Sequence, residues 1–173
     1  MTMKLAATTD AKAIRDLSAL CMAEPNFDIY PMSPMSLAMY QEQAADQQWA
    51  LCVRTGKTVG VIWTAPSLLY PPQDTFLVMA FYTLPTLAET VRRSVGLEMI
   101  IWEAKRRIAH GYKHCEFMLP AVNAKVIAFA NWVEPTPFQS QVAGVDPVTQ
   151  VPHYYRKVWD LADVLAKIVV LTP

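Results

Sequence analysis

The stretch that decides the fold reads Phe81-Tyr82-Thr83-Leu84-Pro85 and then, after a short inserted segment, Arg92-Arg93-Ser94-Val95-Gly96-Leu97-Glu98-Met99-Ile100-Ile101-Trp102-Glu103-Ala104. The apolar run that enters it, residues 75–83, predicts a buried strand. Apolar side chains then recur at helical spacing on one face, at Leu97, Ile100, Ile101, Ala104 and Ile108. The spacing predicts a helix that begins somewhere between Val91 and Gly96 and ends at His110-Gly111.

The flanking sequence supplies further strands and helices. Before the central stretch we expect a strand at 4–7, a helix at 11–23 capped by Thr8-Thr9-Asp10, a short helix at 36–46, and strands at 49–54 and 59–65. After it we expect a strand at 112–119, a helix at 124–132, a strand at 153–159 and a terminal helix at 160–171. This order predicts an α/β or α+β domain, a mixed central sheet with helices on both faces.

Composition excludes several classes of protein. The chain has 173 residues, and its fifteen basic and fifteen acidic side chains cancel, so we expect no nucleic-acid partner. With 53% apolar and 17% charged residues it is not globally disordered. We expect no membrane span and no signal peptide, and therefore a cytoplasmic location. Cys21, Cys52 and Cys115 form no metal-ligand spacing with the histidines, so we expect reduced core cysteines and no metal.

The stretch from Arg92 resembles the acyl-coenzyme A binding motif of the GNAT acetyltransferase superfamily, Gln/Arg-x-x-Gly-x-Gly/Ala. Two registers stay open: one places Arg93 first and Glu98 at the last small position, the other places Val91 first with Ser94 and Gly96 as the small residues. In either register the motif is degenerate. The ending His153-Tyr154-Tyr155-Arg156-Lys157 is similar to the last strand of GNAT-like proteins of tailed phages.

This resemblance implies a GNAT-like domain over residues 1–159, with residues 160–173 as an interaction tail, and acetyl-CoA or another acyl-CoA as cofactor. A helix N-terminus attracts a diphosphate, since its N–H groups are unpaired and its dipole is positive there. The residues that the resemblance assigns to the cofactor are Arg92, Arg93, Ser94, Val95, Gly96 and Asn123. Asn123 is also a candidate helix cap.

Residues for catalysis and substrate binding are further candidates. Tyr82 is a candidate general acid and Glu116 a candidate base, while Phe27, Tyr30 and Tyr155 are candidates for lining the acceptor site. Two functions follow. One is an N-acetyltransferase acting on a small-molecule or peptide amine. The other is a catalytically inactive GNAT-like structural protein, conceivably of a phage particle in the host cytoplasm or virion, that forms a homo-oligomer or binds a virion partner through its tail.

Overall fold

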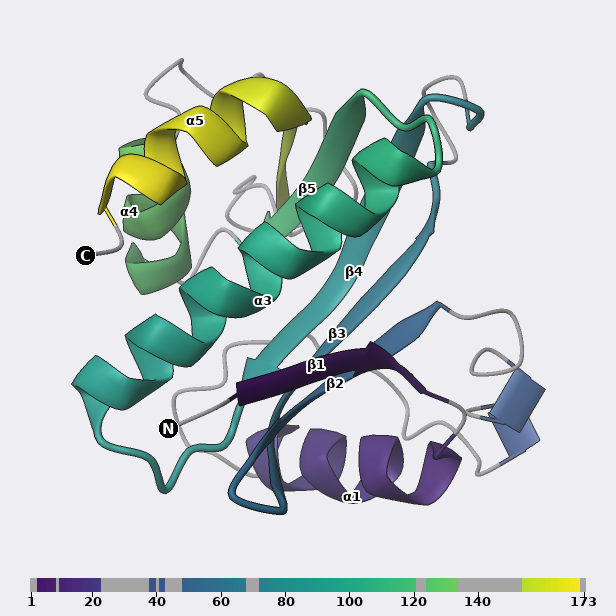
Figure 1. Ribbon diagram of the computed structural model, residues 1–173, viewed down its shortest axis with the longest axis vertical. Coiled ribbons are helices and arrows are strands. Elements are labelled where there is room, and N and C mark those ends of the chain that lie inside the picture. The colour runs from purple at the N-terminus through teal and green to yellow at the C-terminus, as the bar shows by residue number, and fades with distance from the viewer. Residues whose placement is uncertain are drawn as a thin grey trace, which may run out of the picture. The chain divides into compact units, whose positions relative to one another are not determined.

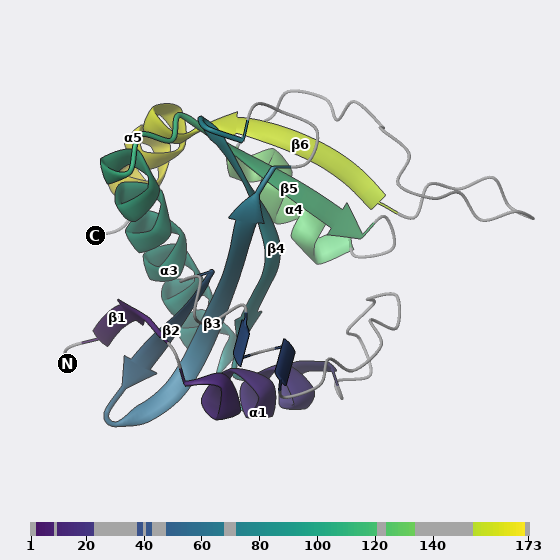
Figure 2. The ribbon, with the colours of Figure 1, turned by 90° about the vertical axis from the view of Figure 1, so that its right-hand side faces the viewer.

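The computed structural model of the chain describes residues 3–8, 10–22, 38–39, 41–42, 48–67, 72–120, 124–133 and 154–171. The chain forms two compact units. Unit 1 comprises Met1–Ala65 and Met79–Glu103, and unit 2 comprises Pro66–Val78 and Ala104–Pro173. The strands follow one another in the sheet in chain order; Figure 1 labels β1 to β5, and Figure 2 also labels β6.

Unit 1 is built on an antiparallel set of strands. β1 (Met3–Ala7) pairs with β2 (Trp49–Arg54), and β2 pairs with β3 (Lys57–Pro66). The β2–β3 turn has positive φ angles at both central residues, 51° at Thr55 and 77° at Gly56. Such a turn matches the right-handed twist of the strands that it joins. The strands of the predicted hairpin at 49–54 and 59–65 are thereby confirmed.

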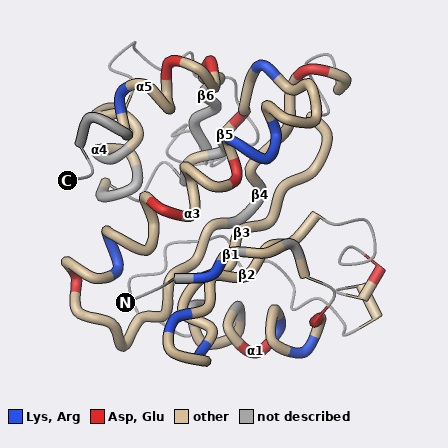
Figure 3. Tube along the Cα trace, in the orientation of Figure 1, with Lys and Arg blue, Asp and Glu red and all other residues tan. Residues whose placement is uncertain are grey.

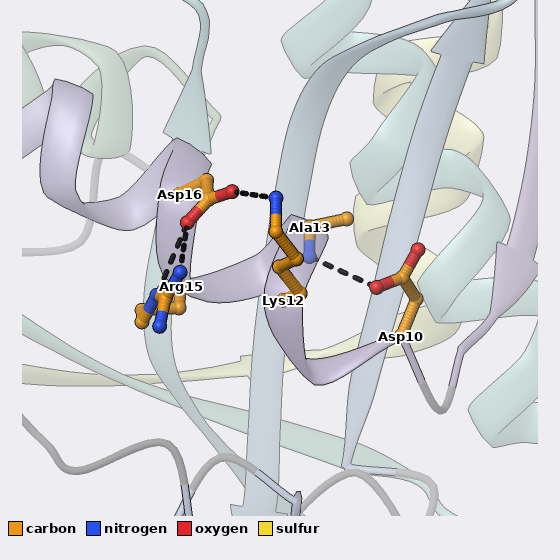
Figure 4. A network of polar contacts seen from close by, with 5 residues as sticks. All are labelled: Asp10, Lys12, Ala13, Arg15 and Asp16. Carbon is orange, nitrogen blue, oxygen red and sulfur yellow. Dashed lines mark hydrogen bonds and ion pairs between the residues drawn. The ribbon is translucent and has the colours of Figure 1, made fainter.

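Helix α1 (Ala11–Met22) begins at a side-chain cap. The Ala13 N–H donates to the Asp10 carboxylate at 2.9 Å, as Figure 4 shows. Asp16, on the exposed side, accepts from Lys12 at 2.8 Å and from Arg15 at 2.7 Å, and these hydrogen bonds lower the pKa of Asp16. Capping satisfies an N–H that the helix itself leaves without an acceptor.

The sheet of unit 1 separates two hydrophobic clusters. On one face α1 packs Ile14 and Leu17 against the strands, in a cluster with Ala11, Trp49, Leu51, Val61, Trp63 and Tyr82. On the other face α3 (Glu89–Ala109) contributes Val95 and Met99 to a cluster with Cys52 and Val59. Neighbouring strand residues point to opposite faces. Helices therefore cover both faces of this sheet, as the sequence predicted.

Unit 2 contains a parallel strand pair. β4 (Thr75–Thr83) pairs with β5 (His114–Pro120) in parallel from Thr75↔His114 to Val78↔Phe117. β6 (Tyr154–Asp160) runs antiparallel beside β5 (Figure 2). Helix α4 (Ala124–Val133) contacts β5, and α5 (Leu161–Leu171) contacts β6 and α4.

The C-terminal helix α5 is part of the core of unit 2. Asp160 caps it by accepting from the N–H groups of Ala162 at 2.9 Å and Asp163 at 3.1 Å. Its Leu161, Val164 and Ile168 are buried. The segment predicted as an interaction tail thus has one face inside its own unit, and binding of a partner through it stays a prediction.

Most predicted elements lie within a few residues of the observed ones, but two predictions about α3 were wrong. The helix begins at Glu89, before the expected range, with an acidic residue in its first turn, where the helix dipole favours one. Of the predicted apolar face, Ile100 and Ala104 are buried, but Ile108 is 40% exposed, and Val95, Met99 and Glu103 are buried as well. Of the helix expected at 36–46, only residues 38–39 and 41–42 are described, and they are helical.

Candidate functional site

The β4–α3 turn positions the start of α3 in unit 1. The Leu84 N–H donates to the carbonyl of Val59 in β3 at 2.8 Å, and the Leu87 N–H donates to the Leu84 carbonyl at 3.2 Å. At the start of α3, the Arg92 N–H donates to the Ala88 carbonyl at 2.9 Å. Because Ala88 has no side-chain oxygen, it cannot cap the N–H groups of the first turn, which an α-helix leaves without internal acceptors.

Charged side chains follow this helix start. An acidic and then a basic segment mark the beginning of α3 in Figure 3. Arg93 and Glu89 form an ion pair of 3.6 Å, with side chains 72% and 73% exposed, and Arg92 is half-buried. An exposed pair of this kind contributes little to stability, so the Arg93 guanidinium can exchange Glu89 for another anion at low cost.

Ser94, Val95 and Gly96 lie inside the helix rather than in a turn before it. Their N–H groups therefore donate to carbonyls of the preceding helical turn. The Ser94 hydroxyl is exposed and lies 3.5 Å from Glu98, while Val95 is fully buried in the cluster with Met99. The structure brings these three residues together with Arg92 and Arg93 on one helix.

The motif glycine, Gly96, has a packing neighbour. A Cβ added at Gly96 would lie 3.2 Å from Cζ of Phe81, which projects from β4. Contacts of this length are tighter than most real Cβ contacts. The absence of a side chain at this position is therefore explained by the approach of the Phe81 ring to the helix.

Tyr82, the candidate general acid, lies in the hydrophobic cluster under α1 and is 6% exposed. It follows Phe81 on β4, so its ring points to the opposite face of the sheet from α3. Its burial among Ile14, Val61 and Trp63 makes it a core residue of unit 1. A role of its hydroxyl in proton transfer stays a prediction.

Glu116, the candidate base, lies in the middle of β5 in unit 2. It pairs in register with Leu77 on one side and Val158 on the other, and it is 1% exposed. Its Oε2 accepts a hydrogen bond of 2.6 Å from the hydroxyl of Ser67, which is also buried. Glu116 is therefore a buried strand residue, and a role of its carboxylate as a base stays a prediction.

The described cysteines are reduced core residues, as predicted. Cys52 and Cys115 are free and buried. Burial, and secondarily the charge of Glu98, raise the pKa of the Cys52 thiol to about 11. Burial also raises the pKa of the Cys115 thiol. A neutral thiol is a weak nucleophile, so neither side chain is suited to covalent catalysis.

The other candidates are placed only in part. Phe27, Tyr30 and Asn123 lie outside the described residues, and Tyr155 is described only through its backbone, which pairs with Leu119 in β6–β5 register. Sequence reasoning missed Ser67. Its 49-residue separation from Glu116 left no local signal of their contact.

The residues that the structure describes contain neither a cluster of metal ligands nor a membrane-spanning helix. Among them, no group of three or more His, Cys, Asp and Glu side chains is arranged to hold a metal ion. Within the same part of the chain, no helix combines the length and the hydropathy that crossing a membrane requires.

No protein-family model matches the sequence, and no curated protein matches it. Solved structures do match. YncA of Salmonella typhimurium, a putative acetyltransferase solved with acetyl-CoA, is 13% identical, with a TM-score of 0.70 over 93% of this chain and 94% of that one. PaiA N-acetyltransferase of Thermoplasma acidophilum, solved with coenzyme A, is 11% identical, with a TM-score of 0.64 over 92% of this chain and 99% of that one.

The ribosomal-protein-S18-alanine N-acetyltransferase of Escherichia coli is similar at 16% identity, with a TM-score of 0.60 over 92% of this chain and 94% of that one. The structural similarity of the chain to these three proteins confirms the predicted fold. The chain has the mixed α/β fold of GNAT acetyltransferases.

Proposed function

We propose that this protein is an acyl-CoA-dependent N-acyltransferase that transfers an acyl group, most simply acetyl, to an amine. The observation that carries the proposal is the GNAT fold, matched over 93% of the chain by an acetyltransferase solved with acetyl-CoA. A fold hosts many functions, so the proposal must also be supported by residues of this chain. The residues that support cofactor binding lie at the start of α3 in unit 1, and the candidate base is considered separately within unit 2.

The start of α3 fits a diphosphate. Ala88 leaves the first N–H groups uncapped, and the helix dipole adds partial positive charge at Glu89, Thr90 and Val91. Arg92 and Arg93 follow within the next turn and supply charge-assisted hydrogen bonds. We assign the diphosphate of coenzyme A to this helix start. Ser94, Val95 and Gly96 then contribute to diphosphate binding only as part of the helix whose N-terminus binds it.

When bound, the thioester supplies an activated acyl carbon for attack by the amine. In the reaction a C–N bond forms and the C–S bond breaks. The acceptor ammonium loses one proton before it attacks, and the nitrogen loses a second proton, which the departing thiolate takes up. Glu116 is the proposed acceptor of the first proton, since it is a buried carboxylate on the strand that follows α3. The acceptor substrate is an amine of a small molecule or a peptide.

Calorimetric titration with coenzyme A and acetyl-CoA tests the cofactor. At about 100 times its Kd, a ligand that binds only the folded state adds about 2.7 kcal/mol to the free energy of unfolding. We expect Arg93→Glu to weaken binding by about tenfold, because one attractive charge becomes repulsive. Lys12→Glu is the matched control: it changes the net charge equally on α1, on the other face of the unit 1 sheet, and should leave the Kd unchanged.

A second candidate function is a GNAT-like protein that has lost catalysis, such as a structural component of a phage particle. It is favoured by the packing of Phe81 behind Gly96 and by the burial of Tyr82. The two candidates predict different results in one assay. Transfer from acetyl-CoA to any member of a panel of primary amines supports the enzyme, and an unchanged melting curve with acetyl-CoA supports the structural role.

A further inference from the structure

Among the described residues, each unit contains a buried carboxylate that accepts a hydrogen bond from a buried hydroxyl. In unit 1 the Thr64 hydroxyl donates to Oε1 of Glu103 at 3.1 Å. In unit 2 the Ser67 hydroxyl donates to Oε2 of Glu116 at 2.6 Å. All four residues are at most 4% exposed. The two pairs are alike in chemistry, but only Glu116 has a proposed role in the reaction.

The Ser67–Glu116 hydrogen bond has the geometry of a strong one. Its length lies in the range of O–H···O⁻ bonds to an ionised carboxylate, which are shorter than bonds between neutral groups. The backbone of Ser67 is held as well, because its N–H donates to the carbonyl of Thr75 at 3.2 Å. The hydroxyl is therefore presented to Glu116 from a fixed position at the end of β3.

The hydrogen bond from Ser67 contributes to the orientation of the Glu116 carboxylate. Its register neighbours on the two adjacent strands, Leu77 and Val158, are apolar and cannot donate a side-chain hydrogen bond. Rotation about the last side-chain torsion of a glutamate is soft, so packing alone does not fix the carboxylate plane. The Ser67 hydroxyl engages Oε2 and thereby sets the plane and the direction of the lone pairs on Oε1.

We propose, on the basis of the function proposed above, that Ser67 is a positioning residue for proton transfer. Its hydroxyl holds the carboxylate of Glu116 in the orientation in which it takes the proton of the acceptor ammonium. One proton moves from the substrate nitrogen to the carboxylate, and the freed lone pair forms the C–N bond. The C–S bond then breaks, and the departing thiolate takes the second proton of the nitrogen. Ser67 itself neither gains nor loses a covalent bond.

Steady-state kinetics of acetyl transfer by the full chain test this role. We expect Ser67→Ala to lower kcat by about tenfold while the KM for the amine changes by less than about twofold, because orientation is lost and substrate binding is not. Ser67→Thr keeps the hydroxyl and should restore most of kcat, and Ser67→Cys, a weak donor, should not. In a Glu116→Gln background, Ser67→Ala should have no further effect on kcat.

Thr64→Val is the matched control, since it removes the hydroxyl from the other buried carboxylate, Glu103. We expect it to lower the melting temperature as Ser67→Ala does and to leave kcat close to that of the wild type. Equal losses of kcat in the two variants would show that Ser67 acts through stability alone, and would overturn the inference. The same conclusion follows if Glu116→Gln retains the wild-type kcat.

The experiment distinguishes failure of the proposed function from failure of the proposed role of Ser67. A wild-type chain that neither binds acetyl-CoA nor acetylates any amine of the panel overturns the transferase and the role of Ser67 together. A wild-type chain that is active, with Ser67→Ala equally active, overturns the role of Ser67 only. If Ser67→Ala does not fold, Ser67→Thr is compared with Ser67→Cys. A lower kcat for the Cys variant than for the Thr variant supports the role of Ser67, and equal kcat values overturn it.

Discussion

Gly60 of β3 lies directly under Met99 of α3, so close that a Cβ at Gly60 would stand 2.5 Å from the methionine sulfur and 3.2 Å from Cγ1 of Val95. Real Cβ atoms essentially never lie as close as 2.5 Å to another heavy atom, so a methyl group at Gly60 would require the end of the Met99 side chain to shift. The glycine therefore leaves space for the fully buried Met99 side chain between α3 and β3. We expect Gly60→Ala to lower the free energy of unfolding by about 1–3 kcal/mol through overpacking, measured by urea denaturation.

A double-mutant cycle identifies the cause of that loss. Met99→Ala removes the sulfur and should itself be destabilising, because Met99 is fully buried. In the Met99→Ala background the added methyl group finds space, so Gly60→Ala should cost much less than in the wild type. Equal costs in the two backgrounds would contradict the packing explanation.

Gly96 gives a second prediction, which separates packing from cofactor binding. Its N–H lies inside α3, so Gly96→Ala should change the Kd for coenzyme A by less than about twofold. The added Cβ stands 3.2 Å from the Phe81 ring, while alanine is the better helix former, by about 1 kcal/mol. We expect these effects to offset each other in the melting temperature. A loss of binding with unchanged stability would restore Gly96 to the diphosphate site.

Cys52 predicts a dependence of stability on pH. The ordinary pKa of a cysteine thiol is 9.0, and burial raises the pKa of the Cys52 thiol to about 11. As the pH rises, the Cys52 thiol therefore ionises in the unfolded chain before it ionises in the folded one. Its contribution to stability is complete below the ordinary pKa of 9.0 and is lost as the pH rises through about 11. The free energy of unfolding should fall more steeply over this interval in the wild type than in Cys52→Ala.

Helix α5 predicts that the C-terminal segment stabilises the protein. Ile168 is fully buried, and Val164 lies one turn earlier on the same face. We expect Ile168→Ala to lower the free energy of unfolding by about 2–5 kcal/mol. Lys167→Ala, one residue earlier on the exposed side, is the control. If only the oligomeric state changed, and not the melting temperature, the segment would act through a partner instead.

The regular elements could be predicted from the sequence because each carries its own periodicity. The apolar run at Thr75–Thr83 predicted β4, and the spacing of Ile14 and Leu17 predicted α1. The start of α3 could not be placed in this way, since residues 89–94 are polar except for Val91 and suit either a loop or the first turns of a helix. The motif with Arg92, Arg93 and Gly96 led to the expectation that the helix begins later, between Val91 and Gly96.

The candidate site was harder to predict than the fold, because its contacts join residues far apart in the chain. Glu116 was recognised as a titratable strand residue, but its burial depends on pairing with both Leu77 and Val158. The contact of Phe81 with Gly96 likewise requires β4 and α3 to be packed together. Spacing in a single sequence contains no information about such contacts.

The pairing of β4 with β5 also has a kinetic consequence. Parallel strands cannot be joined by a tight turn, and here the whole of α3 lies between Thr83 and His114. The chain entropy lost in bringing Phe76 beside Cys115 is incurred before the pairing is gained, which slows folding relative to a local hairpin. In stopped-flow refolding, the β2–β3 hairpin should therefore acquire protection from hydrogen exchange before β5 does.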